Sequence, residues 1–131
     1  MAEWPTFGGM FPPSFYQHLQ QVNHTGMRAG TQRQHFTPIW VVQVGGRVFA
    51  RSWTKSETGW YATLLQTGTG HLQYGDHIIA ITARRLPPDD ALHAAINEAY
   101  LTRYNSPENI PYAQGIAQAD YAHYTLELEP A

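Results

Sequence analysis

The sequence predicts an α+β domain in which antiparallel hairpins form a closed or partly closed barrel, with helices packed around it. Residues 38–53 contain two β-branched and aromatic runs on either side of the glycine pair 45–46, and residues 71–86 repeat this arrangement around 75–76. A strong helical pattern follows at residues 89–105. Both faces of the first hairpin are largely apolar, so we expect it to be covered on both sides, as in a barrel.

Length and composition are typical of one globular domain, and we take residues 1–131 as that domain. Hydrophobic residues make up 43% of the chain and charged residues 14%. The aromatic share of 13% indicates either a ring-lined cavity or interface, or a core rich in rings. Residues 1–12 show no periodicity and are predicted to form an irregular N-terminal arm.

Charge and residue content exclude several classes of function. A net charge of −2 and the lack of any basic run longer than Arg84-Arg85 argue against nucleic-acid binding. The chain has no cysteine, so it has neither disulfides nor a thiolate nucleophile. No apolar run reaches the ~18 residues of a membrane span, and residues 1–30 do not resemble a signal peptide, so we expect a cytoplasmic protein without a membrane partner.

The N-terminal part is predicted to form a short helix and then a strand. Ser14 is the expected cap of a helix that runs to about Val22, because Phe15, Leu19 and Val22 fall on one stripe. Residues 27–36 are predicted to form the first strand.

The first hairpin has a defined register, because two glycines suit a two-residue primed turn. The opposed pairs are then Val44 with Arg47, Val42 with Phe49, and Trp40 with Arg51. Directly opposed residues share a face of the sheet. One face is expected to carry Trp40, Val42, Val44, Arg47, Phe49, Arg51 and Trp53, and the other Ile39, Val41, Val48, Ala50 and Ser52.

Residues 54–57 read Thr-Lys-Ser-Glu, which is the capping-box pattern of a helix N-terminus. We expect a short helix from there to about Leu65, ended by residues 68–70.

The remaining elements are a second hairpin, a long helix and a closing strand. The opposed pairs of the second hairpin are Tyr74 with His77 and Leu72 with Ile79, and its core face is Leu72, Tyr74, Ile79 and Ile81. Asp89 or Asp90 starts the long helix, whose apolar stripe is Leu92, Ala95 or Ile96, Ala99 and Tyr100. Residues 106–118 are predicted as a loop with a helical turn or two, and residues 121–130 as a strand.

The candidate binding site lies where the first hairpin meets the predicted helix. Arg51 shares a face with the indoles of Trp40 and Trp53, and a helix start offers free N–H groups and a partial positive charge to a phosphate or carboxylate. The expected ligand contacts are Arg51, Ser52, Trp53, Lys55, Ser56, Trp40 and Trp60, joined by Arg33, His35 and Thr37 if residues 27–36 form a strand beside them.

A purely structural reading of the same residues stays open. Thr54 and Glu57 then only cap the helix, Lys55 is solvated, and Arg51 lies over Trp40 as a cation–π pair. The seven histidines show no metal-ligand spacing, no nucleophile motif occurs, and Asp89-Asp90 suit a helix start, so we assign no metal site and no catalytic residue.

Four motifs carry a resemblance to a known family. They are Pro-Ile-Trp-Val-Val-x-Val at 38–44, Phe-Ala-Arg-Ser-Trp at 49–53, Gly-Trp-Tyr at 59–61 and Ala-Tyr-Leu-Thr-Arg-Tyr at 99–104. From about Pro38 to Pro130 the chain resembles a small bacterial family of unknown function. That family is grouped with the split-barrel flavin and deazaflavin binders, which include pyridoxamine-phosphate oxidases and deazaflavin-dependent nitroreductases.

This resemblance implies a split β-barrel of about six mainly antiparallel strands with flanking helices. It also implies FMN or a deazaflavin coenzyme bound beside residues 51–60, and an oxidoreductase whose cofactor ring carries the hydride. Residues 28–33 depart from the phosphate loop Gly-Arg-Lys/Arg-Ser/Thr-Gly of the deazaflavin relatives. The alternative is therefore a cofactor-free protein of the same fold that binds a small ligand or acts as a scaffold.

A homodimer is expected from the two apolar faces of the first hairpin. The outer face must be covered either by the chain's own helices or by a second copy.

Overall fold

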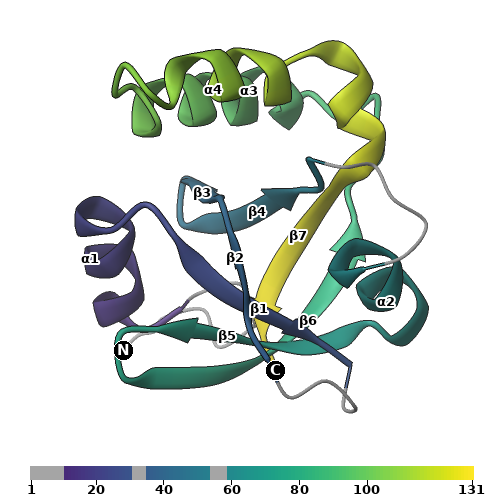
Figure 1. Ribbon diagram of the computed structural model, residues 1–131. Coiled ribbons are helices and arrows are strands. Elements are labelled where there is room, and N and C mark those ends of the chain that lie inside the picture. Colours follow the sequence, from purple (N-terminus) through teal and green to yellow (C-terminus); the bar gives the residue numbers. More distant parts are fainter. Residues whose placement is uncertain (1–10, 31–34, 54–58) are drawn as a thin grey trace, which may run out of the picture.

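The computed structural model describes residues 11–30, 35–53 and 59–131, where seven strands form one antiparallel sheet (Figure 1). The strands are β1 (Thr25–Ala29), β2 (Thr37–Ile39), β3 (Val41–Val44), β4 (Arg47–Arg51), β5 (Thr69–Tyr74), β6 (His77–Arg85) and β7 (Thr125–Pro130), in the order β2-β1-β5-β6-β7-β4-β3. Trp40 alone separates β2 from β3, the two ends of this order, so the sheet curves into a nearly closed barrel. The predicted α+β class and antiparallel barrel are confirmed, with seven strands in place of about six.

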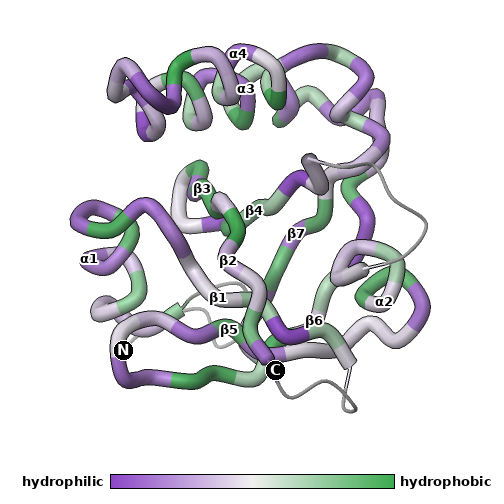
Figure 2. The backbone as a smooth tube through the Cα atoms, viewed as in Figure 1, coloured by the Kyte–Doolittle hydropathy of each residue, from purple (hydrophilic) through white to green (hydrophobic). Residues whose placement is uncertain are grey.

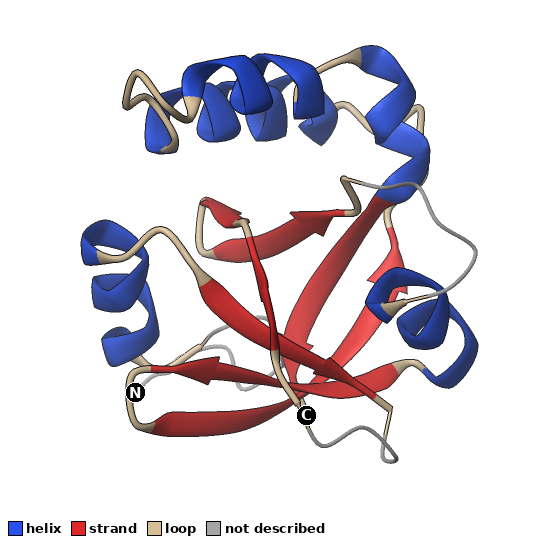
Figure 3. Ribbon diagram, in the orientation of Figure 1, coloured by secondary structure: helices blue, strands red, loops and turns tan. Residues whose placement is uncertain are grey.

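The helices pack on different sides of this barrel (Figure 3). They are α1 (Pro13–Gln21), α2 (Trp60–Thr67), α3 (Leu92–Arg103), α4 (Ile110–Ile116) and the 3-10 helix η1 (Ala119–Tyr124). The helices α3 and α4 lie together above β3 and β4, while α1 and α2 flank the barrel on opposite sides (Figure 1). None of the helices in the described ranges combines the length and the apolarity that crossing a bilayer requires.

Two apolar cores lie on either side of the first hairpin. The barrel core comprises Phe11, Phe15, Leu19, Met27, Ala29, Ile39, Val41, Val48, Ala50, Tyr61, Leu64, Leu72, Tyr74, Ile81, Leu126 and Leu128. The outer core, between the hairpin and α3–α4, comprises Val42, Phe49, Leu86, Ile96, Tyr100, Tyr104, Ala113, Ile116 and Tyr121. Successive residues of a strand face opposite sides, so neighbouring residues of β3 and β4 belong to opposite cores. Both strands accordingly contain consecutive hydrophobic residues (Figure 2).

Both faces of the first hairpin are buried, each in its own core, and the predicted division of its residues between the two faces is confirmed. The chain's own helices α3 and α4 cover the outer face, so that face does not need a second copy of the chain. The homodimer stays a prediction, and sedimentation velocity over a range of concentrations tests it.

The registers of both hairpins are confirmed except at one pair. Val44 pairs with Arg47 and Val42 with Phe49 in the first hairpin, and Tyr74 pairs with His77 in the second. The expected pair of Trp40 with Arg51 is absent, because the ladder between β3 and β4 ends at the pair of Val41 with Ala50. The hydroxyl of Tyr100 lies between Trp40 and Arg51: it accepts the Arg51 backbone N–H at 3.0 Å and donates to the Trp40 carbonyl at 3.0 Å.

Three expectations for the helix starts and the first strand are wrong. Pro12, not Ser14, is the N-cap of α1, and the Ser14 hydroxyl lies 3.3 Å from that of Tyr74. The helix expected after Thr54 begins instead at Trp60, with Gly59 as its N-cap. The strand expected at 27–36 is β1, which ends at Ala29.

The C-terminal region also differs in detail from the prediction. Residues 121–124 belong to η1, and the closing strand starts only at Thr125. The long helix is confirmed as α3, but it begins at Leu92 with Ala91 as its N-cap, and not at Asp89 or Asp90. The Asp90 side chain accepts the backbone N–H of Leu92 at 2.9 Å. Residues 106–118, predicted as a loop with a helical turn or two, contain the seven-residue helix α4, about two turns, as expected.

The buried carboxylate of Glu127 on β7 forms hydrogen bonds to the neighbouring strands β4 and β6. Glu127 is 2% exposed and accepts two hydrogen bonds from Arg47, each of 2.8 Å, and one of 3.0 Å from Arg84. The hydrogen bonds from Arg47 hold the pKa of Glu127 below its usual value of 4.5, with a further contribution from Arg84, against the opposing effect of burial.

This lowered pKa makes the stability of the protein depend on pH in a defined direction. The unfolded chain binds the proton more readily than the folded one, so Glu127 stabilises the fold above pH 4.5 and this contribution is lost as the pH falls through the lower folded-state pKa. We expect Glu127→Gln to be less stable than wild type at neutral pH, and this deficit to shrink under acidic conditions. Urea denaturation across that range measures it, and a deficit that does not change with pH would refute the assignment.

Candidate functional site

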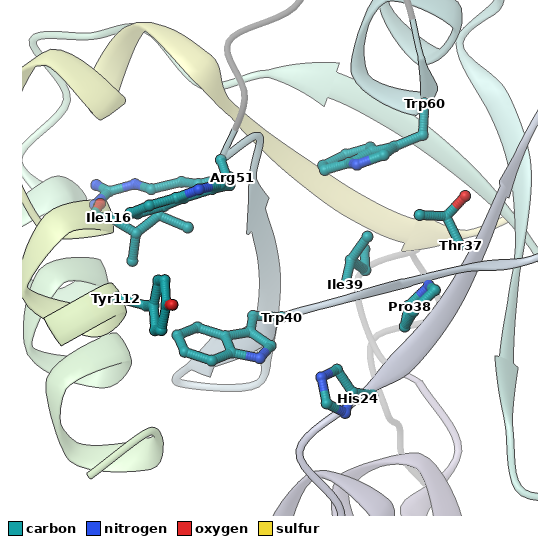
Figure 4. Close-up of a pocket in the computed structure, with 10 residues that line it drawn as sticks. His24, Thr37, Pro38, Ile39, Trp40, Arg51, Trp60, Tyr112 and Ile116 are labelled. Carbon is teal, nitrogen blue, oxygen red and sulfur yellow. The ribbon is translucent and has the colours of Figure 1, made fainter. Parts of the chain in front are cut away.

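A cavity of about 420 Å³ lies between the β2–β3 junction, α2 and α4 (Figure 4). It is lined by His24, Thr37, Pro38, Ile39, Trp40, Arg51, Trp53, Trp60, Tyr112 and Ile116. Most of the lining is aromatic or aliphatic, and it includes three of the four tryptophans in the chain. We call this space the aromatic cavity.

Trp40 forms one wall of the aromatic cavity because Tyr100 of α3 and Tyr104, the residue after α3, hold it in place. Its ring stacks on that of Tyr104 with centroids 3.9 Å apart and planes 4° apart. The Tyr104 hydroxyl also accepts the backbone N–H of Val41 at 3.1 Å, and the Trp40 carbonyl accepts the hydroxyl of Tyr100. These contacts fix both the ring and the backbone of Trp40.

Trp53 forms the wall beside α4. Its ring stacks on Tyr121 with centroids 5.7 Å apart, and it meets the ring of Tyr112 edge-on at 5.7 Å. The Tyr121 hydroxyl donates to the Trp53 carbonyl at 2.6 Å. Trp53 is 45% exposed and lines the cavity, so part of its surface is accessible to a ligand.

Trp60 lies across the cavity at the first position of α2, and its half-buried ring packs on the barrel core (Figure 4). It meets the ring of Tyr61 edge-on, with centroids 6.2 Å apart. Tyr61 in turn is anchored by a hydrogen bond from its hydroxyl to the His123 carbonyl at 3.0 Å. The third indole is therefore held by α2 and η1.

Arg51 contributes to the wall of the cavity, but its guanidinium hydrogen-bonds to the protein itself. Nε donates to the Thr125 hydroxyl at 2.9 Å, and Nη1 donates to the Asn97 side chain at 2.5 Å and the Ile116 carbonyl at 2.9 Å. Nη2 lies 3.1 Å from Nδ1 of His93. The residue is 3% exposed, and its side chain runs toward Ile116 (Figure 4).

These contacts define the tautomer of the His93 imidazole. Arginine has no acceptor atom, so Nδ1 of His93 accepts from Arg51 and the proton sits on Nε2, which donates to the Pro87 carbonyl at 2.8 Å. All four partners of the Arg51 guanidinium are neutral groups, and burial lowers the pKa of Arg51 from its usual value. The network joins β4, α3, α4 and β7.

Protein groups therefore accept most of the hydrogen bonds that the Arg51 guanidinium can donate, and its expected role as an anion contact stays a prediction. The cation–π pair expected over Trp40 is replaced, because the Arg51 guanidinium lies 5.8 Å from the Tyr100 ring centroid. The Thr54–Glu57 capping box falls outside the described residues.

Five of the predicted site residues line the aromatic cavity: Thr37, Trp40, Arg51, Trp53 and Trp60. Ser52 is only 2% exposed and is not among the lining residues. Arg33, Lys55 and Ser56 lie outside the described ranges, and His35 is exposed and does not line the cavity.

Sequence reasoning missed the contribution of α3 and α4. Tyr112 and Ile116 lie in a segment predicted mainly as a loop, and no pattern connected that segment to the tryptophans. His93, Asn97 and Tyr100 are four and three residues apart, a spacing that places them on one side of a helix. This row of hydrogen-bonding groups is the signal that could have indicated a polar partner opposite the helix. No group of three or more potential metal ligands occurs among the described residues.

Comparisons with known proteins agree with the fold but add no activity. No curated protein matches the sequence. A solved structure, the conserved hypothetical protein Rv2991 from Mycobacterium tuberculosis, is similar over 99% of this chain and 85% of its own, with a TM-score of 0.55 and 13% identity. At that identity the likeness shows the fold alone. Residues 17–128 match the sequence model of DUF2255, described as an uncharacterized protein conserved in bacteria, and the chain therefore belongs to the DUF2255 family.

Proposed function

We propose that this protein binds a small molecule with a flat aromatic ring in the aromatic cavity. The observation that carries the proposal is the convergence of Trp40, Trp53 and Trp60 on one space of about 420 Å³. Ligand pockets typically measure ~300–1,000 Å³ and are mainly apolar with a few polar groups. Here His24 and Thr37 supply polar groups, and the indoles supply faces for offset stacking.

The isoalloxazine ring of a flavin, or its deazaflavin counterpart, is the first candidate for this ring. The chain resembles a family grouped with split-barrel binders of these cofactors, and the nearly closed antiparallel barrel is compatible with that architecture. A bound flavin or deazaflavin would supply the redox chemistry, and the protein would position the ring and exclude water. In this form of the proposal the protein is an oxidoreductase that transfers hydride.

A second candidate is binding of an uncharged aromatic ligand without any cofactor. The hydrogen bonds of Arg51 favour it, because a guanidinium that donates to Asn97, Ile116 and Thr125 does not offer those donors to a phosphate. A phosphate-bearing ligand would then depend on other cations, and Lys55 is the candidate from the sequence.

A comparison of riboflavin with FMN separates these possibilities, because the two differ only in the phosphate. Saturable quenching of tryptophan fluorescence by both, with similar affinity, supports ring binding without a phosphate site. At least tenfold tighter binding of FMN, about 1.4 kcal/mol, that is lost in Lys55→Ala, supports a nucleotide site. No saturable binding of either flavin, or of the matching deazaflavins, contradicts the cofactor proposal, and an uncharged aromatic dye then tests the second candidate.

The ring-binding proposal also predicts a defined effect at Trp60. Trp60→Leu keeps an apolar side chain on the barrel core but removes the indole face, so we expect the dissociation constant of the ring ligand to rise at least tenfold. The control is Leu65→Ala, on the exposed side of the same helix and outside the cavity lining. Equal dissociation constants for Trp60→Leu and wild type would exclude Trp60 from the site.

A further inference from the structure

We propose that Gly115 is the residue that shapes the aromatic cavity, because its missing side chain allows the indole of Trp53 to lie directly against α4. Glycine is the least favourable residue in a helix apart from proline, since it loses the most backbone freedom on folding. Gly115 nevertheless lies within the seven-residue helix α4, next to its last residue Ile116. A packing requirement explains why glycine occupies this position.

The close approach is measured from the position that a Cβ atom would take. A Cβ added to Gly115 would lie 2.8 Å from Cη2 and 3.0 Å from Cζ3 of Trp53. Ordinary van der Waals contacts between carbon atoms are about 3.5–4.0 Å. Both atoms belong to the rigid indole, so an alanine here cannot be accommodated by turning a flexible chain end. The whole ring has to move, or α4 has to move away from it.

The surroundings of the ring limit where it can go. Tyr121 stacks on it and also binds the Trp53 carbonyl, while Tyr112, three residues before Gly115 on the same helix, meets its edge. Trp53 is 45% exposed and lines the aromatic cavity. Displacement away from α4 therefore alters the space that we assign to the ligand ring.

It follows that Gly115 is a positioning residue that acts through Trp53. The part of the inference that concerns ligands rests on the proposed function: the site would accept a flat ring that lies along the Trp53 indole, and a larger residue at 115 would narrow it. The part that concerns packing is independent of any ligand.

A thermal-unfolding comparison tests the packing part with no ligand present. Gly115→Ala is made both in wild type and in a Trp53→Ala background, where the indole is absent. We expect it to lower the melting temperature in wild type, and to raise it by about 4 °C in the Trp53→Ala background, where only the gain in helix propensity remains. The control is Gln114→Ala, an exposed position of α4, which should shift both backgrounds equally.

Equal shifts for Gly115→Ala in the two backgrounds would overturn the inference, because they would show that Gly115 does not act through Trp53. A shift that changes sign between the backgrounds supports it. Since Trp53 is partly exposed, the Trp53→Ala background is expected to fold, and the comparison remains valid even if Gly115→Ala alone is strongly destabilised.

Riboflavin binding then tests the ligand part. We expect Gly115→Ala to weaken riboflavin binding at least tenfold when Trp53 is present, and to change it less than twofold in the Trp53→Ala background. Equal weakening in both backgrounds would contradict a role through Trp53. If wild type binds neither riboflavin nor FMN, the flavin proposal fails, whereas the melting-temperature comparison still decides the role of Gly115.

Discussion

Arg51→Ala is expected to lower the free energy of unfolding by at least about 3 kcal/mol, a large part of the ~5–15 kcal/mol that stabilises a typical domain. The substitution removes a buried guanidinium that bonds to His93, Asn97, Thr125 and the Ile116 carbonyl. A buried acceptor that loses its donor costs about 1–3 kcal/mol, and here several lose it together. Urea denaturation followed by circular dichroism measures the change.

The matched control for this prediction is Arg85→Ala, because Arg85 is exposed on β6. It should change the free energy of unfolding by no more than about 0.5 kcal/mol. Arg51→Lys should recover only part of the loss, since an ammonium group cannot reproduce the planar fork of donors. An Arg51→Ala protein as stable as wild type, but unable to bind ligand, would show that the guanidinium serves the ligand instead.

Tyr100→Phe is expected to cost about 2 kcal/mol. The hydroxyl of this fully buried residue connects the backbone of Arg51 to that of Trp40, where the first hairpin leaves its ladder. Without it a buried N–H and a buried carbonyl lose their partner. Burial also raises the pKa of the Tyr100 hydroxyl, so it stays protonated and able to donate to Trp40.

Two measurements separate this effect from a general loss of packing. Tyr112→Phe removes a hydroxyl from a side chain that is 55% exposed and should leave the free energy of unfolding within about 0.5 kcal/mol of wild type. Tyr100→Phe should in addition weaken ring-ligand binding, because Trp40 forms a wall of the aromatic cavity. A Tyr100→Phe protein with wild-type stability would refute the bridging role.

The parts of the fold that follow from local patterns were predictable from the sequence. The glycine pair at 45–46, both residues with positive φ, between two β-branched and aromatic runs predicts the register of the first hairpin. The same reasoning correctly separates its two faces. The register fails only at Trp40, where the Tyr100 hydroxyl, 60 residues away, replaces the ladder. Local propensity carries no information about a partner so distant in sequence.

In the candidate site, too, contacts between residues distant in sequence could not be predicted. The tryptophans of the aromatic cavity were predicted because they cluster around the hairpin, but the partners of Arg51 were not. His93 and Thr125 are 42 and 74 residues from it, on elements whose position depends on the closure of the whole barrel. A helix as short as α4 has too few turns to show an apolar period, so Tyr112 and Gly115 had no recognisable pattern.

A crystal structure of the protein with riboflavin would show where the ring binds. We expect the ring in the aromatic cavity, in contact with at least two of the indoles of Trp40, Trp53 and Trp60, with the Arg51 guanidinium still bonded to Asn97 and Thr125. A ring bound elsewhere on the protein, or the cavity filled by the protein's own side chains, would contradict it.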